Sequence, residues 1–169
     1  MTRVRRKCLL AVTAAAVALI AATLLSWPTW LVYNPSDSAP RGWYLQRPAR
    51  ELRPGTSVFA RLPSDAAQLA HARGYLPQHL LILKRIGAAG GQHVCVRDGL
   101  VRIDGRVVAV LRTRDGRGRS LAAWPGCRPL VADEVFLFAS ESPASFDSRY
   151  FGPVRREAIL GEAVPLWTR

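Results

Sequence analysis

Charged and apolar residues are sharply separated at the start of the chain. Residues 1–7 carry three arginines and one lysine, whereas no charged residue occurs from Cys8 to Trp27. An apolar run of about 20 residues is long enough for a helix to cross the hydrocarbon core of a bilayer. Basic residues ahead of such a run keep the N-terminus in the cytoplasm. We therefore expect a cytoplasmic segment at 1–7, a single transmembrane helix at 8–27, and the remainder of the chain beyond the lipid bilayer.

A cleaved signal peptide is the alternative for this segment, because its Ala-rich interior offers small-residue cleavage sites. The apolar part of a signal peptide is usually shorter, at about 7 to 15 residues. Under either interpretation the rest of the chain is exported. We expect the protein in a bacterial inner membrane, with its domain in the periplasm. That compartment permits disulfides, so Cys95 and Cys127 are a candidate pair. Two free thiols remain the other possibility, since the sequence does not give the distance between them.

Beyond Tyr33 the pattern changes to short β-favouring runs separated by turn residues. Closely spaced Pro and Gly indicate loops over 34–55, and an Arg-rich segment at 112–120 indicates an exposed loop. Asp-Gly pairs at 98–99 and 104–105 favour tight hairpins, and Ala66 to Arg73 has a short helical pattern. The expected strands are Ser57 to Leu62, Leu80 to Ile86, His93 to Val96, Leu100 to Ile103, Arg106 to Leu111, Glu134 to Ala139 and Ala158 to Leu166. The predicted class is mostly β, with hairpins and meanders, one short helical insertion, and a single domain over 34–169.

The composition is more informative about one lysine, Lys84, than about the net charge. The chain has 169 residues and a net charge of +12, but its arginines are spread without the stripe that marks a nucleic-acid interface. We therefore expect no nucleic-acid partner. The lysines are only Lys7 and Lys84, and Lys84 ends the apolar run that begins at Leu80. Strand alternation puts Lys84 and Arg85 on opposite faces, so one of these cations can point inward.

An inward lysine has different chemistry from an inward arginine. Burial disfavours the ammonium and lets a lysine lose its proton, whereas arginine stays protonated. Lys84 is thus a candidate general base. The structural alternative is an edge-strand lysine that discourages aggregation.

Two further polar segments stand out. Asn34 to Tyr44 is dense in Ser, Asp, Pro and Gly, which indicates either a turn-rich linker or a serine nucleophile close to the membrane. Glu141 to Val154 contains an acid, hydroxyls, an arginine and aromatics, which suits either an ion pair that fixes a loop or a cluster that orients a catalytic group.

Metal and cofactor chemistry have no support in the sequence. The three histidines lack acidic partners at motif spacing, and neither a zinc motif nor a Gly-rich phosphate loop occurs. We expect no metal and no cofactor. A serine nucleophile with a lysine base requires neither.

Taken together, these segments resemble the bacterial type I signal peptidase superfamily, most closely its conjugative-transfer branch, the TraF-type peptidases. Leu80 to Gly91 resembles the family's lysine box, an apolar strand that ends in Lys-Arg and is followed by a Gly-rich turn. Ser145 to Gly152 resembles the conserved box that follows later in the family's sequences. The nucleophile box N-x-x-x-S-x-P-x-G-x-Y is matched by Asn34, Ser38, Pro40, Gly42 and Tyr44.

The resemblance implies roles for individual residues. Ser38 would be the nucleophile and Lys84 the general base. The backbone N–H of Ser38 and the hydroxyl of Ser36 would form the oxyanion hole. Supporting groups would be Ser145, which orients the lysine, and an ion pair between Asp147 and Arg149.

The implied function is a membrane-anchored serine endopeptidase that cleaves the signal or leader peptide of an exported precursor after small residues. A conjugative pilin is the expected substrate, and a conjugation or secretion apparatus is a further expected partner. The late box lacks the Gly-Asp-Asn-Arg-Asp-Asn run of housekeeping signal peptidases, and the chain lacks their large accessory β domain. The alternatives are a housekeeping signal peptidase and a non-catalytic, membrane-tethered β domain that binds a transfer apparatus.

Overall fold

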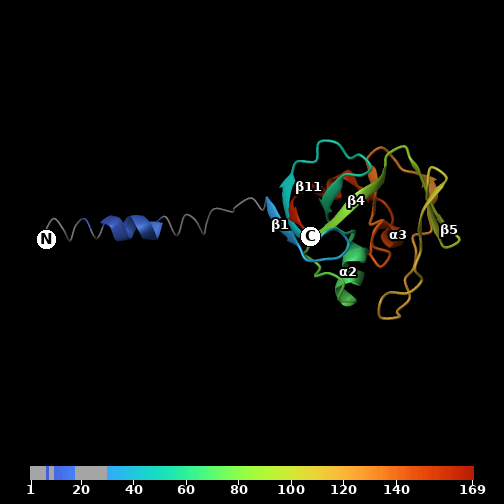
Figure 1. Ribbon diagram of the computed structural model, residues 1–169, viewed down its shortest axis with the longest axis horizontal. Helices are drawn as coiled ribbons and strands as arrows, with labels where there is room; N and C mark the ends of the chain where they lie inside the picture. The colour runs from blue at the N-terminus through green and yellow to red at the C-terminus, as the bar shows by residue number, and fades with distance from the viewer. Residues whose placement is uncertain (1–6, 8–9, 18–29) are drawn as a thin grey trace.

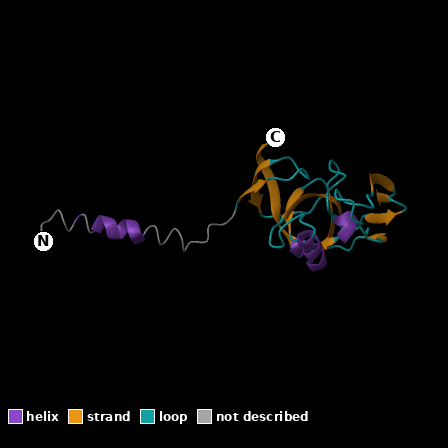
Figure 2. Ribbon diagram, turned by 90° about the horizontal axis from the view of Figure 1, so that it is seen from below, coloured by secondary structure: helices purple, strands orange, loops and turns teal. Residues whose placement is uncertain are grey.

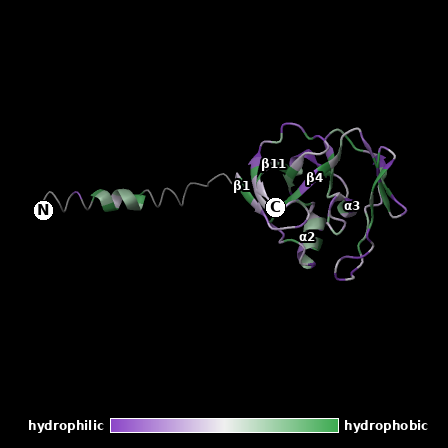
Figure 3. Ribbon diagram, viewed as in Figure 1, coloured by the Kyte–Doolittle hydropathy of each residue, from purple (hydrophilic) through white to green (hydrophobic). Residues whose placement is uncertain are grey.

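The computed structural model describes residues 7, 10–17 and 30–169. Residues 10–17 are helical, exposed and mostly hydrophobic (Figure 3). Most of the transmembrane helix expected at 8–27 lies outside the described residues. Among the helices that are described, none is both long and apolar enough to span a bilayer.

Residues 30–169 are mostly β-structure, as the sequence predicted (Figure 2). One group of strands is β1 (Leu31–Asn34), β2 (Gly42–Arg47), β3 (Ser57–Ala60), β4 (Ile82–Ala89), β9 (Glu134–Phe138), β10 (Val154–Arg155) and β11 (Ile159–Thr168). A second group is β5 (His93–Arg97), β6 (Leu100–Ile103), β7 (Arg106–Val110) and β8 (Cys127–Pro129). The helices are α2 (Ser64–Ala72), α3 (Ser148–Phe151) and the 3-10 turn η1 (Arg156–Ala158).

The two groups of strands form two antiparallel sheets. The larger sheet has the order β1-β2-β11-β3-β4-β9-β10, and the smaller has the order β7-β6-β5-β8. Figure 1 shows β1 and β5 at opposite sides of the domain, with α2 beneath β4. The chain passes from β4 directly into β5, so β4 connects the two sheets.

The two predicted hairpin turns are confirmed. Asp98 and Gly99, between β5 and β6, have φ of 54° and 73°. Asp104 and Gly105, between β6 and β7, have φ of 49° and 79°. Two successive positive φ values give the turn whose twist matches that of the flanking strands.

The loop interpretation of residues 34–55 is wrong for its middle part and holds on either side of it. β2 occupies Gly42–Arg47 and pairs with both β1 and β11. The prolines flank this strand instead of interrupting it, so its backbone N–H groups remain available. A side chain at Gly42, whose φ is 145°, would collide with the Trp167 carbonyl, so glycine is what allows β2 to approach β11 there.

Other boundaries also differ from the prediction. The helix begins at Ser64 and ends at Ala72, and it packs its small buried face, Ala66, Ala67 and Ala70, against the domain. The elements β1, β8, β10, α3 and η1 were also not expected.

β4 is an interior strand with hydrophobic core on both faces. It lies between β3 and β9, so the edge-strand explanation of Lys84 is wrong. Ile82 and Ile86 belong to one buried cluster, and Leu83 belongs to another with Tyr44 and Phe59. A strand covered on both faces has a nearly continuous apolar sequence, which explains the weak alternation of this run.

Cys95 and Cys127 are joined by a disulfide. They are cross-strand partners on β5 and β8 of the smaller sheet. Of the two states that the sequence left open, the structure contains the bonded one.

Candidate active site

A cleft of about 770 Å³ opens on the face where the polar segments of the sequence meet. The turn between β1 and β2 lines it with Ser36 and Ser38, and β4 lines it with Lys84. The loop after β9 contributes Ser145. Three segments that are far apart in the sequence therefore share one cavity, whose remaining walls are largely apolar.

The turn that carries Ser38 is organised by the side chain of Asn34. Asn34 is buried at the end of β1, with 6% of its surface exposed. Its Nδ2 donates to the backbone carbonyls of Ser36, Ala39 and Pro40, each at 3.1 Å. Its Oδ1 accepts from the backbone N–H of Ser36 at 3.1 Å and from Ser36 Oγ at 2.7 Å. Ser36 Oγ lies 3.1 Å from Ser38 Oγ, so the three side chains form a hydrogen-bonded chain.

Lys84 is the inward cation of β4. Only 6% of Lys84 is exposed, whereas Arg85 lies on the surface and pairs with Glu141 at 3.8 Å. Desolvation lowers the pKa of Lys84 from 10.5 to about 8. The nearby carboxylate of Asp147 raises this pKa and the guanidinium of Arg149 lowers it, both less strongly. Within residues 30–169, no side chain or carbonyl forms a hydrogen bond or ion pair with this ammonium.

A buried ion pair supports the loop that carries Ser145. Arg149 donates to Asp147 through Nε at 2.7 Å and through Nη2 at 2.9 Å. Arg149 Nη2 also donates to the carbonyl of Ser145 at 3.0 Å, and Asp147 accepts from the backbone N–H of Ala139. The pair thus fixes the Ser145 loop to the end of β9, with Asp147 and Arg149 almost fully buried.

Ser145 itself is left with an unused hydroxyl. It is 6% exposed, and among the described residues its Oγ is the buried side-chain oxygen that has no hydrogen-bond partner. A buried hydroxyl without a hydrogen-bond partner lowers the stability of the fold unless another group forms a hydrogen bond with it. Because Ser145 and Lys84 line the same cleft, the lysine or a bound peptide can supply the missing partner.

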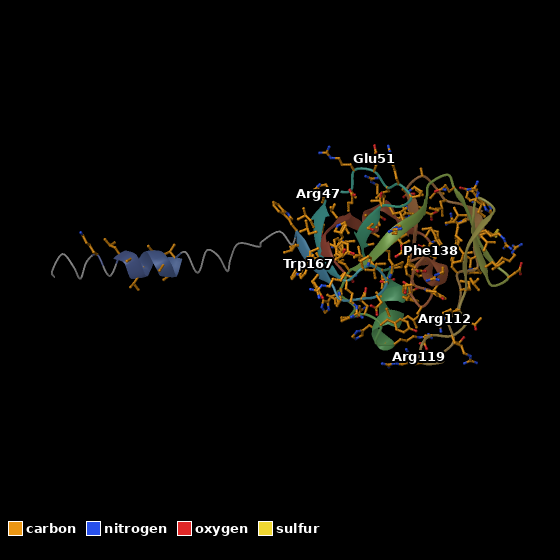
Figure 4. The ribbon with its side chains drawn as sticks, viewed as in Figure 1. Arg47, Glu51, Arg112, Arg119, Phe138 and Trp167 are labelled. Atoms are coloured by element: carbon orange, nitrogen blue, oxygen red, sulfur yellow. A yellow bond between two sulfur atoms is a disulfide. The ribbon has the colours of Figure 1, made fainter. Side chains whose placement is uncertain are left out.

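The cleft also has a wall that the sequence did not predict. The loop 112–121 reaches α2, and Figure 4 shows Arg119 beside that helix. The side chain of its Asp115 is 5% exposed and accepts hydrogen bonds from Tyr75 and Arg119. Arg73 donates to the carbonyl of Ser120 at 2.8 Å, which closes the contact. A single acid within an Arg-rich segment was the available sign of this anchor, and the segment was expected to be an exposed loop.

No metal site is evident in the described part of the chain, where no three His, Cys, Asp or Glu side chains are grouped to hold an ion. One histidine, His79, lines the cleft. The site therefore offers a serine on a constrained turn, a desolvated lysine and hydroxyls nearby. These groups suit proton abstraction and nucleophilic attack.

The sequence has clear relatives. A sequence model of the family described as signal peptidase, peptidase S26, matches residues 4–167. The conjugal transfer protein TraF of Agrobacterium tumefaciens (strain 15955) is 34% identical over 173 residues, covering 96% of this chain and 97% of that protein. The TraF protein of Agrobacterium fabrum (strain C58 / ATCC 33970) is 36% identical, covering 80% and 81%. A plasmid transfer protein TraF of Escherichia coli is 33% identical, covering 88% and 90%.

Among solved structures, a signal peptidase I from Enterococcus faecalis V583 aligns with a TM-score of 0.42 and 16% identity. The alignment covers 67% of this chain and 97% of that chain. The family match spans nearly the whole sequence, and the TraF relatives are similar over most of their own lengths. The predicted resemblance is thus confirmed: this chain belongs to the signal peptidase family, peptidase S26, as a TraF-type member.

Proposed function

We propose that this peptidase uses Ser38 as its nucleophile and Lys84 as its general base to cleave the leader peptide of an exported precursor. One observation carries the assignment. Lys84 is buried and desolvated in the same cleft as Ser38, with a pKa lowered to about 8. A general base works best when its pKa is close to the operating pH.

The chemistry follows from these groups. Neutral Lys84 takes the proton of Ser38, and Ser38 Oγ attacks the carbonyl carbon of the scissile peptide bond. The backbone N–H of Ser38 and the hydroxyl of Ser36 stabilise the oxyanion, and such donors are commonly worth about 2.7 to 4 kcal/mol of barrier each. Lys84 then gives its proton to the leaving amine, and water attacks the acyl-enzyme. Ser145 holds the ammonium, while Asp147 and Arg149 hold the loop that carries Ser145.

The substrate is a membrane-associated, pilin-like precursor with small residues before the cleaved bond. The relatives named as conjugal or plasmid transfer proteins support this choice. We place the enzyme in the bacterial inner membrane, with residues 8–27 as its anchor, its N-terminus in the cytoplasm and its peptidase domain in the periplasm. The Cys95–Cys127 disulfide supports an oxidising compartment. An anchor that shares the bilayer with its substrate raises their effective concentration.

The direct test incubates the full-length chain in detergent with a conjugative pilin precursor and, separately, with a general secretory precursor. We expect correct cleavage of the pilin precursor alone and no cleavage by Ser38→Ala. Circular dichroism and thermal unfolding of Ser38→Ala serve as the folding control.

Each other result has a definite meaning. Cleavage of both precursors would indicate a housekeeping signal peptidase. Full activity of Ser38→Ala would exclude Ser38 as the nucleophile. A folded chain that binds the pilin precursor without cleaving it would support the non-catalytic alternative.

A further inference from the structure

The side chain of Asn34 makes more hydrogen bonds than any ordinary turn requires. Its amide reaches three backbone carbonyls, one backbone N–H and one hydroxyl, all within residues 36–40. Asn34 is 6% exposed, so these bonds form where water cannot readily replace them. This residue has so far been only one position of the nucleophile box, without a role.

The orientation of the Asn34 amide is determined by its partners. The carbonyl oxygens of Ser36, Ala39 and Pro40 accept hydrogen bonds and cannot donate. The amide atom that faces these carbonyls must therefore be Nδ2. The atom that accepts from the backbone N–H and the hydroxyl of Ser36 must be Oδ1. A flipped amide would direct one oxygen at three others.

This orientation fixes the direction of the hydroxyl hydrogens. Oδ1 only accepts, so the 2.7 Å bond from Ser36 uses the hydrogen of Ser36 Oγ. The 3.1 Å bond between the two serines must then use the hydrogen of Ser38. In the resting site Ser38 therefore donates to Ser36, and Ser36 donates to Asn34. When substrate binds, both hydroxyls must turn about their C–O bonds, so that Ser38 donates to Lys84 and Ser36 donates to the oxyanion, while both oxygen atoms stay in place.

The same amide also shapes the backbone around the nucleophile. Its Nδ2 binds the carbonyls of Ser36, Ala39 and Pro40, so these carbonyls point toward Asn34. Among the described residues, none accepts a hydrogen bond from the backbone N–H of Ser38. A turn with its carbonyls satisfied internally and this N–H unused is prepared to stabilise a negatively charged oxygen.

We infer that Asn34 is a positioning residue of the active site, whose side-chain amide holds the Ser38 turn and keeps Ser36 Oγ beside the nucleophile, so that both serine oxygens are in place before substrate binds. The inference rests on the proposed function, since it assigns Asn34 a role only if Ser38 is the nucleophile. Asn34 touches no reacting atom in this scheme and acts through Ser36 and the backbone.

The test measures kcat, KM and the pH dependence of cleavage for the full-length chain in detergent, using a peptide with small residues before the scissile bond. Asn34→Ala should lower kcat about 100-fold while KM stays within about threefold, because peptide binding does not use this amide. The pH at which the rate is half-maximal should stay as in wild type, since Lys84 is untouched. Asn34→Asp should not rescue kcat, because it keeps the acceptor for Ser36 but turns an oxygen toward three carbonyls.

Tyr44→Phe is the matched control. The Tyr44 hydroxyl also binds the Pro40 carbonyl, at 2.7 Å, but it has no bond to Ser36 or Ser38. Tyr44→Phe therefore loosens the same turn without breaking the hydrogen-bonded chain of Ser38, Ser36 and Asn34, and kcat should fall less than about fivefold. A loss in Asn34→Ala no larger than that of Tyr44→Phe, or a loss confined to KM, would overturn the inference.

Two outcomes need separating. If Asn34→Ala does not fold, Asn34→Asp decides, because it keeps the acceptor for Ser36 and removes only the donor to the three carbonyls. A kcat for Asn34→Asp equal to wild type would then overturn the inference, and a drop of about tenfold with KM unchanged would support it. Activity in Ser38→Ala would reject the proposed function itself, whereas an inactive Ser38→Ala beside a fully active Asn34→Ala would reject only the role of Asn34.

Discussion

The two sides of the cleft are built in opposite ways. The Ser38 turn is stabilised by local hydrogen bonds, all between residues close in sequence, and its two serines lie near the surface. Lys84 lies on an interior strand and is covered by residues from distant parts of the chain. The serine side is polar and locally determined, whereas the lysine side is apolar and determined by the fold.

This difference matches the needs of the two groups. A serine oxygen must meet a substrate, so it has to be accessible and its hydrogen bonds have to be arranged in advance. A lysine must lose its proton near neutral pH, and burial is the main cause of that loss here. Neither design would serve the other residue.

The largest expected effect comes from making the lysine side permanently charged. Lys84→Arg should lower kcat/KM by about 10⁴-fold, because a guanidinium does not release its proton. Arg85→Lys is the matched control, since it makes the reverse exchange one position away on the exposed face and should change kcat/KM less than twofold. The measurement is peptide cleavage by the full-length chain in detergent. Full activity in Lys84→Arg would remove the general-base assignment.

The next effect concerns the buried pair that supports the lysine side. Asp147→Asn should lower the free energy of unfolding by about 3 to 5 kcal/mol, because it leaves the guanidinium of Arg149 buried without its anion. Asp133→Asn is the control, since its ion pair with Arg155 is largely exposed and should contribute less than about 1 kcal/mol. Urea unfolding at pH 7 measures both variants. Equal losses would show that burial of the Asp147 pair is energetically unimportant.

The same contrast explains what the sequence could predict. Local sequence patterns predicted most strands, both Asp-Gly hairpins and the polar segments that line the cleft. They could do so because turns and short strands depend mainly on residues that are neighbours in the sequence. Opposite-face placement of Lys84 and Arg85 also followed from alternation. Which of the two points inward depends on the strands on either side of β4, and no local pattern contains that information.

Other features of the structure were not predicted from the sequence, because they too depend on contacts between distant residues or on the folded turn. β2 was missed because its flanking prolines resemble loop signals, although its pairing with β11 comes from the far end of the chain. The Asp115 anchor was missed because its partners Tyr75 and Arg73 lie about 40 residues away. Asn34 was noticed only as a motif position, since its five bonds become apparent only when the turn is folded.

A third prediction tests the energetic cost of the buried lysine. The pKa of Lys84 is lowered in the folded state, so the unfolded chain binds more protons between about pH 8 and 10.5, and stability contributed by this group must rise with pH there. A shift of this size corresponds to about 3 kcal/mol. Lys84→Met should therefore be more stable than wild type at pH 7, and this advantage should shrink by about 3 kcal/mol by pH 10.5. A difference that stays constant with pH would mean that Lys84 is not desolvated.

The smallest effect is the pH dependence of the rate itself. With a pKa of about 8, about a tenth of Lys84 is neutral at pH 7 and nearly all of it at pH 9, so kcat/KM should rise about tenfold over this interval. The serine side should not contribute, because the hydrogen bond from Arg41 lowers the pKa of Asp37 and keeps that carboxylate charged throughout. His79→Gln is the matched control, since His79 is the histidine that lines the cleft and histidine is a common general base in enzymes. The same tenfold rise in His79→Gln would assign the proton acceptor to the lysine side, whereas a flat profile in that variant would transfer the role to His79.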